Sequence, residues 1–448
     1  MPKYGVIIYN SIFQSPKDEK TLFENPHILY GLSPCGWRSF LVSSLPSLHS
    51  FFKVYRWSTA REIIIGIRSI KKIPEKVKYY NAKRILVICG PTIRKIGLVD
   101  KVIEQIKTLN VEFEVFDKVE PEPHIETAEE LKDIVREGKF NLVIGVGGGS
   151  VLDVSKITAL MATNSGNVED YIGMYKIKKP GIPKILIPTT AGTGSEVTEA
   201  IVLKGKISST KAVIYSEYAP AEVAILDPEM TLPAPPKVTA ATGMDALSHA
   251  IESYMSIDST PFSEAFAEKA ISLIADNLRK AVFQGQNIIA RYNMLLASTL
   301  ASMAWSQSSV CQGHAIGLAI GTKYNLPHGV SVALALPYVM WFNRVAIPER
   351  LAYIAMLMGV DVSGLTPYEA SFKAIEAVLN LENDIGLPTK LKDIPSAKRD
   401  DIPELAEGAY KAQRLLIHSP RITTKKDLET IINMMYEGDL SRKVSKTC

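Results

Sequence analysis

The chain has 448 residues with a formal net charge of +4, and 46% of them are hydrophobic against 22% charged. A globular chain of this length exceeds one ordinary hydrophobic core, so we expect two main domains. The sequence has no basic block interleaved with aromatic residues and no run near the ~20 apolar residues of a bilayer span, so we expect neither a nucleic-acid nor a membrane partner.

Residues 1–51 mix aromatic residues, prolines and charges without a sustained period of 2 or 3.6. We treat them as an N-terminal extension of uncertain structure, which could be an added strand or hairpin, a disordered arm, or the product of a misplaced translation start. A recognisable domain begins near "FKVYRWSTAREIIIG", and we attach no function to the segment before it.

From about residue 80, β-branched runs alternate with segments of helical periodicity. The predicted elements are strands at 82–90, 111–119 and 184–190, helices at 96–110 and 128–140, and a strand, glycine turn and helix within 141–162. This alternation predicts an α/β N-terminal domain over 52–232, built on a parallel sheet with right-handed crossovers. After the proline-rich stretch 227–238, long amphipathic helices predict an all-α domain over 233–448.

Two loops follow predicted strands and contain glycines or hydroxyl side chains. "GVGGGSVLDVSK" (145–156) lets backbone N–H groups approach an anion at a helix N-terminus, although such a turn is also a common tight connection. "PTTAGTGSEVT" (188–198) offers threonine and serine hydroxyls, although a polar loop with a helix cap would look the same. Because both loops leave the carboxyl ends of parallel strands, together they favour a nucleotide diphosphate site.

Metal-ligand residue types occur in two stretches of the helical part. Asp245 and His249 are four residues apart in "GMDALSHAIES", so they share one helix face, as an ordinary surface pair also would. His314 begins the apolar helical segment "HAIGLAIG", and Pro327 places His328 on a loop or at a new helix start. Three imidazoles and a carboxylate would suit Fe(II) or Zn(II), whereas the alternative is a set of core histidines.

These motifs also carry a family resemblance. "GGGSVLDVSK", "PTTAGTGSEVT", "GMDALSHAIESY" and "HAIG…NLPHG", in this order, resemble the iron-dependent (group III) alcohol dehydrogenases from about residue 52 to the C-terminus. The resemblance implies a dinucleotide-binding α/β domain and an all-α metal-binding domain in a dehydroquinate synthase-like architecture, with the active site between them. It also implies hydride transfer between an alcohol carbon and NAD(H) or NADP(H), with the metal polarising the substrate oxygen, in a homodimer.

By position, the resemblance assigns the metal ligands as Asp245, His249, His314 and His328. It assigns cofactor contacts to two loops, a strand end and a lysine, namely Gly90, Gly147, Gly148, Gly149, Ser150, Asp153, Thr189, Thr190, Thr193, Ser195 and Lys211. A small alcohol or aldehyde is the implied substrate.

Three positions depart from the family pattern. Leu318 stands where many members have an auxiliary histidine, so proton transfer must use the cofactor ribose, a water or another side chain. Gly90 replaces an Asp of NAD-preferring members, with Arg94 and Lys95 nearby, which favours NADP(H) over NAD(H). Glu122 replaces a common Asn, with an effect on cofactor contacts that the sequence does not define.

Two other functions stay open at this point. A polyol or polyol-phosphate dehydrogenase, or a sugar-phosphate cyclase of the same fold, would need several cations near the metal, where only Lys323 and Arg344 are found. A non-catalytic binding protein would not need the ligand set. The cysteines Cys35, Cys89, Cys311 and Cys448 are widely spaced without a CxxC motif, which indicates a reducing cytoplasm.

Overall fold

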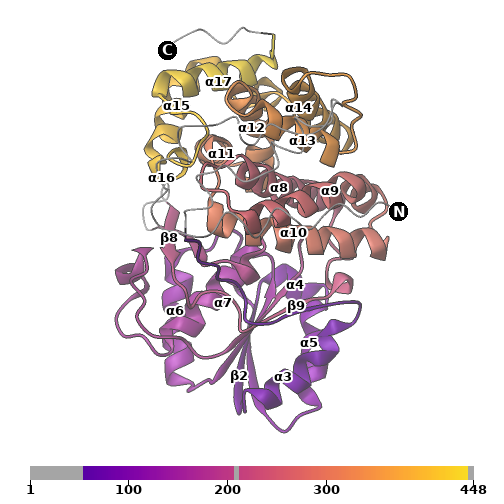
Figure 1. Cartoon of the computed structure of the whole chain (residues 1–448). Coiled ribbons are helices and arrows are strands. Elements are labelled where there is room, and N and C mark those ends of the chain that lie inside the picture. The colour runs from indigo at the N-terminus through magenta and orange to yellow at the C-terminus, as the bar shows by residue number, and fades with distance from the viewer. Residues whose placement is uncertain (1–53, 206–210, 442–448) are drawn as a thin grey trace, which may run out of the picture. The chain divides into compact units, whose positions relative to one another are not determined.

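A six-stranded parallel sheet occupies the first half of the computed structural model, which describes residues 54–205 and 211–441 (Figure 1). The strands follow the order β1-β9-β6-β4-β2-β3. Their bounds are β1 Ile63–Ile65, β2 Arg84–Cys89, β3 Glu112–Phe116, β4 Leu142–Gly147, β6 Lys184–Pro188 and β9 Val223–Leu226. The predicted α/β fold is confirmed, whereas the N-terminal extension 1–51 lies outside the described residues.

Each central strand contributes side chains to both faces of the sheet, because successive residues of a strand point in opposite directions. In β2, Leu86 and Ile88 belong to one buried cluster, while Ile85, Val87 and Cys89 belong to the other. The helices of this half cover these faces, and their bounds are α3 Ile73–Tyr79, α4 Pro91–Lys95, α5 Leu98–Lys107, α6 Ile125–Glu137 and α7 Gly149–Met161. Burial on both faces explains why these strands are nearly continuous apolar runs.

A second, smaller sheet lies beside the first and was not predicted from the sequence. It has the order β5-β8-β7, with β5 at Gly173–Met174, β7 at Ala200–Lys204 and β8 at Lys211–Tyr215. Strands β7 and β8 pair antiparallel, and Lys204 lies opposite Lys211 in their register. Lys211 is therefore the first residue of a strand.

The second half of the described chain is helical (Figure 1). Its helices are α8 Pro236–Met255, α9 Pro261–Phe283, α10 Ile288–Ser308, α11 Gln312–Tyr324, α12 His328–Asn343, α13 Pro348–Leu357, α14 Pro367–Asp384, α15 Ile402–Lys411, α16 Gln413–Leu416 and α17 Lys425–Glu437. The predicted boundary at 232/233 falls between β9 and α8. Among the described helices, none has both the length and the apolar character that a membrane span requires.

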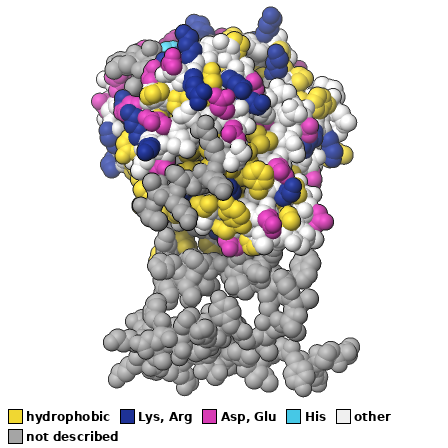
Figure 2. Space-filling view, turned by 90° about the horizontal axis from the view of Figure 1, so that it is seen from above, with side chains coloured by type: hydrophobic (Ala, Val, Ile, Leu, Met, Phe, Trp, Pro, Cys, Tyr) yellow, Lys and Arg dark blue, Asp and Glu magenta, His cyan; other side chains and the backbone are white. Residues whose placement is uncertain are grey.

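Charges of both signs are interspersed on the face that Figure 2 shows, which looks onto the helical half. Apolar side chains lie between them on the described part of this face. The visible described surface therefore carries no broad patch of one charge.

Helix α10 joins the helical half to the sheet. Leu295 of α10 packs in one buried cluster with Leu186 of β6 and Leu226 of β9. The Thr299 hydroxyl donates to Glu196 Oε1 at 2.9 Å, and the Ser302 hydroxyl donates to the Thr193 carbonyl at 2.8 Å. The loop after β6 is thus held against the helical half.

A candidate metal centre facing a glycine-rich loop

Two of the predicted ligands come from helix α8. This helix begins after Pro235 with Pro236 in its first turn, and it is buried on nearly every side from Thr239 onward. The four-residue spacing brings His249 Nε2 to 3.9 Å from Asp245 Oδ1, and both side chains are almost completely buried. A solvated surface pair, the ordinary alternative for this spacing, is therefore excluded.

The other two histidines come from α11 and α12. His314 lies in the first turn of α11 and is 5% exposed. Helix α11 ends at Asn325 in the left-handed conformation, Pro327 caps the next helix, and His328 is the first residue of α12. Of the two placements expected for His328, a loop or a new helix start, the structure has the helix start.

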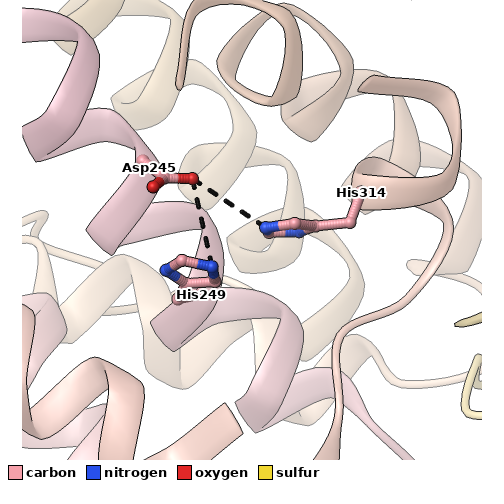
Figure 3. A group of neighbouring side chains, drawn as sticks. All are labelled: Asp245, His249 and His314. Atoms are coloured by element: carbon pink, nitrogen blue, oxygen red, sulfur yellow. Dashed lines mark ion pairs between the residues drawn. The ribbon is translucent and has the colours of Figure 1, made fainter. Parts of the chain in front are cut away.

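One carboxylate oxygen faces all three imidazoles. Asp245 Oδ1 lies 3.9 Å from His249 Nε2, 3.9 Å from His314 Nε2 and 3.7 Å from His328 Nε2. Figure 3 shows Asp245 and His249 on one helix with His314 directed toward them from another. Candidate ligand atoms of Asp245, His249 and His314 all lie within 4.8 Å of one another.

Two of these four atoms are buried without hydrogen-bond partners among the described residues. Asp245 Oδ1 and His314 Nε2 are buried without a donor or acceptor among the described residues. Unpaired buried polar atoms are costly, so their presence indicates a missing partner at this point. Burial lowers the pKa of His314 to about 3, so its imidazole is neutral near pH 7, as a metal ligand must be. The donor set fits a divalent transition metal.

Glu252 orients His314 and was missed in the sequence. Its carboxylate pairs with His314 Nδ1 and accepts from the backbone N–H of Gly313 at 2.6 Å and of Cys311 at 3.2 Å. This contact directs Nε2 toward Asp245, as partners of metal-binding histidines commonly do. The sequence contained a signal for Glu252, because Asp245, His249 and Glu252 are spaced four and three residues apart and so share one helix face.

Trp305 of α10 forms another wall of the cluster. Its ring stacks on His249 with the centroids 5.2 Å apart, and its Nε1 is buried without a partner among the described residues. The indole thus covers one face of the His249 ring, and its Nε1–H donor has no partner among the described residues.

A cavity of about 350 Å³ connects the histidines with the two predicted cofactor loops. The predicted residues that line it are Gly149, Ser150, Asp153, Thr190, Thr193, Ser195 and Lys211. Gly149 opens helix α7, and a Cβ there would lie 2.7 Å from Thr193 Cγ2, so the two loops approach closely. A helix N-terminus between hydroxyl side chains is a chemically suitable place for a phosphate.

Asp153 is engaged within the protein. Its Oδ1 accepts from the Ser195 hydroxyl at 2.5 Å and from Lys156 Nζ at 3.2 Å, and its Oδ2 accepts from the Val202 N–H at 3.0 Å. Lys156, which the sequence analysis did not single out, is fully buried and also donates to the Ala200 carbonyl at 2.6 Å. This network ties α7 to the second loop and to β7.

Four predicted cofactor residues lie outside the lining of this cavity, namely Gly90, Gly147, Gly148 and Thr189. Gly90 follows β2 and caps α4, and a Cβ on it would lie 2.8 Å from the Val119 carbonyl oxygen. Arg94, which was expected near a cofactor phosphate, pairs with Asp100 at 2.7 Å.

Some of the other residues named from the sequence line the cavity, and others lie elsewhere on the protein. Leu318 lines the cavity and is half-buried. Glu122 also lines it, with a left-handed φ of 51° and an Oε1 3.8 Å from Lys211 Nζ. Lys323 instead pairs with Glu404, and Arg344 stacks on Trp341, so neither supplies a cation to the cavity.

Known proteins match most of the chain in sequence. The family profile described as iron-containing alcohol dehydrogenase matches residues 60–228, and the profile of the Fe-containing alcohol dehydrogenase family, C-terminal, matches residues 239–436. The chain belongs to the iron-containing alcohol dehydrogenase family. It is 40% identical over 381 residues to long-chain-alcohol dehydrogenase 1 of Geobacillus thermodenitrificans, covering 84% of this chain and 95% of that relative.

Solved structures agree with this assignment. A crystal structure of 1,3-propanediol oxidoreductase superimposes with a TM-score of 0.83 at 36% identity, covering 86% of this chain and all of the other. Sulfoacetaldehyde reductase from Bifidobacterium kashiwanohense in complex with NAD+ has a TM-score of 0.77 at 28% identity, with 86% and 100% coverage. The protein is an oxidoreductase of the alcohol dehydrogenase type, which interconverts alcohols and aldehydes.

Proposed function

We propose that this alcohol dehydrogenase holds a divalent metal ion with Asp245, His249, His314 and His328, with Fe(II) as the first candidate and Zn(II) as the alternative. The observation that carries the proposal is the convergence of three Nε2 atoms on one buried carboxylate oxygen at 3.7–3.9 Å. Imidazole and carboxylate ligands suit both metals.

We further propose that a nicotinamide dinucleotide lies along the cavity between the glycine-rich loop and the threonine loop. Direct contacts are assigned to the backbone of Gly149 and Ser150, to the hydroxyls of Thr190 and Thr193, and to Lys211, all of which line the cavity. Asp153 and Ser195 are assigned a positioning role, because their polar atoms bond to each other. Gly147, Gly148 and Thr189 shape the loops. The NAD+ complex of one related structure supports this class of cofactor.

We propose NADP(H) as the preferred form, because Gly90 supplies no carboxylate to repel a 2′-phosphate. Lys95 is exposed in the same helix, whereas Arg94 already pairs with Asp100. Lys95→Glu should lower the kcat/KM ratio of NADPH to NADH about 10-fold, and Lys101→Glu on the next helix should leave it within 2-fold. An unchanged ratio in Lys95→Glu would contradict this preference. Gly90→Asp is the weaker test, since its Cβ would strike the Val119 carbonyl.

In the proposed reaction, hydride passes between the substrate carbon and the nicotinamide ring. Asp245, His249, His314 and His328 would hold the metal ion, which would supply a Lewis acid for the substrate oxygen. Glu252 keeps His314 in the tautomer whose Nε2 is free, and Trp305 fixes His249. The Leu318 side chain at the cavity wall is apolar and has no titratable group. Proton exchange must therefore use the cofactor ribose, a water or another side chain.

The proposal is tested by metal content and NAD(P)H oxidation on an aldehyde panel. The wild type reconstituted with Fe(II) or Zn(II) should bind one ion per chain and reduce aldehydes, and His249→Ala should lose both properties while remaining folded. His418→Ala is the matched control, because His418 pairs with Asp258 away from the cavity. Normal turnover by metal-free His249→Ala would overturn the proposal.

A homodimer in the cytoplasm remains part of the proposal. Cys89 and Cys311 are free and buried, which supports a reducing compartment, while Cys35 and Cys448 lie outside the described residues. Light scattering during size-exclusion chromatography should give twice the 49.3 kDa chain mass. A monomer at working concentration would contradict the dimer and leave the enzyme assignment intact.

A further inference from the structure

The cavity contains a guanidinium that the proposed chemistry does not use. Arg414 of α16 lines the same cavity as the histidine cluster. Within the described part of the chain, its side chain has one hydrogen-bond partner, the Tyr215 hydroxyl of β8, at 3.4 Å. A guanidinium has five N–H donors, so most of its donor capacity is unused.

Other arginines of the helical half are differently placed. Arg350 pairs with Glu264 and donates to the Tyr254 carbonyl, and Arg421 donates to the Phe342 carbonyl and covers its ring. Arg414 has no carboxylate within ion-pair distance among the described residues, and it is the one arginine in the cavity lining. Its charge is therefore available to a ligand.

Arg414 lies on a helix that contacts the helix carrying His314. Helix α16 packs against α11, which carries His314 in its first turn and Leu318 one turn later. Leu318, Leu326 and Leu415 line the same cavity. The cavity lining thus combines the histidine cluster, apolar side chains and the Arg414 guanidinium.

We propose that Arg414 is a specificity-determining residue that binds the negatively charged end of a short aldehyde or alcohol substrate. The inference rests on the proposed function, since the reacting end must lie at the histidine cluster. One guanidinium matches one negative charge, so the substrate class is a monoanionic aldehyde with a carboxylate or sulfonate at the far end. Planar carboxylates pair with guanidinium through two parallel hydrogen bonds.

The cavity lining also includes Lys204 and Lys211, which lie opposite each other on β7 and β8, and we assign neither of them this role. Lys211 Nζ lies 3.8 Å from Glu122 Oε1, so its charge has a partner, and it belongs to the half that contains the glycine-rich loop. Arg414 is exposed at the cavity wall, so salt should screen its attraction for an anion. That salt dependence separates an ionic contact from a difference in shape.

The test compares 4-oxobutanoate, 3-oxopropane-1-sulfonate and butanal with metal-loaded enzyme. The wild type should show a kcat/KM for at least one of the anionic aldehydes about 10-fold above that for butanal, and the preference should shrink between 0.05 and 0.5 M salt. Arg414→Leu should remove most of this preference through KM, and Arg414→Lys should keep part of it. Lys411→Leu is the matched control, because Lys411 is 76% exposed and does not line the cavity.

Binding gives a second readout that does not need turnover. Calorimetry on the metal-loaded protein should show 4-hydroxybutanoate binding about 10-fold more tightly than butan-1-ol in the wild type, with the difference lost in Arg414→Leu. A wild type that prefers butanal would overturn the inference. So would an Arg414→Leu variant that weakens all three aldehydes equally or raises only the cofactor KM.

These outcomes are distinct from failure of the proposed function. Butanal reduction that His249→Ala abolishes, without an anionic preference, would overturn the role of Arg414 and leave the metal site intact. If metal-loaded wild type reduced none of the three aldehydes and bound no more metal than His249→Ala, the proposed function would fail and the inference with it.

Discussion

The contact between Glu252 and His314 determines which imidazole nitrogen is available at the cluster. An ionised carboxylate can only accept, so its contact with Nδ1 requires the proton on that nitrogen and leaves Nε2 facing Asp245. In Glu252→Gln, the side-chain amide can donate to Nδ1, which favours the tautomer with its proton on Nε2. We expect metal affinity to fall 10- to 100-fold, as is typical when the partner of a ligand histidine is changed. Competition with a chromophoric chelator measures this, and unaltered affinity would show that Glu252 does not orient His314.

Ser309 adopts a backbone conformation that normally requires glycine. It caps the end of α10 with φ 65° and ψ 175°, and it lines the cavity. Such a conformation costs a residue with a Cβ about 1–3 kcal/mol of strain. Glycine removes this strain, but it also makes the unfolded chain more flexible, which offsets part of the gain. Ser309→Gly should therefore raise the free energy of unfolding by about 1 kcal/mol in denaturant titrations. Ser309→Ala keeps the Cβ, so equal stabilisation by both variants would contradict this explanation.

At the residue scale, the sequence predicted those site residues that lie close together in a motif. Asp245 and His249 share one helix face, and His328 follows a proline, so local rules place them. Arg414 gave no such signal, because it meets the cavity through the packing of α16 on α11, which is a tertiary contact. The network of Lys156 likewise depends on segments about 40 residues away.

Helix α14 contains a buried carboxylate that destabilises it at neutral pH. Both oxygens of Glu382 are buried without a partner among the described residues, and burial raises the pKa of its carboxyl well above the ordinary value. Because the pKa is higher in the folded state, folding favours the protonated carboxyl. The contribution of Glu382 to stability is therefore fully present below its unfolded pKa of about 4.5. This contribution is lost as the pH rises toward the folded value.

Glu382→Gln should therefore increase stability more at pH 8 than at pH 5, by about 1–3 kcal/mol at the higher pH. Chemical denaturation at both pH values measures the difference. Glu376 on the same helix is the control, because it is 42% exposed and pairs with Lys373. Glu376→Gln should change stability by less than about 0.5 kcal/mol at either pH. A pH-independent effect of Glu382→Gln would contradict the assigned titration.

Element length explains only part of which strands the sequence revealed. The predicted strands near residues 84, 112, 142 and 184 correspond to β2, β3, β4 and β6, which have five or six residues each. The missed strands β1 and β9 have three and four residues, too few to show a period. Strands β7 and β8 have five residues each and were also missed, so length alone does not account for them.

The whole molecule should gain stability from the metal ion. A ligand that binds only the folded state adds RT ln(1 + [L]/Kd), or about 2.7 kcal/mol at 100 times Kd. Calorimetry with increasing Fe(II) or Zn(II) should therefore show a rising unfolding temperature in the wild type. In His249→Ala the temperature should stay constant, and an equal rise in both would place the binding site elsewhere.

Helix α10 touches both the threonine loop and the histidine cluster. Ser302 bonds to the backbone of Thr193, and Trp305, three residues later, stacks on His249. Helix α10 thus connects the proposed diphosphate site with the cavity wall beside the proposed metal ligands. Separating these two would break the Ser302 bond, so we expect the cavity to widen more readily on the side where Arg414 and Tyr215 are joined only by a 3.4 Å contact.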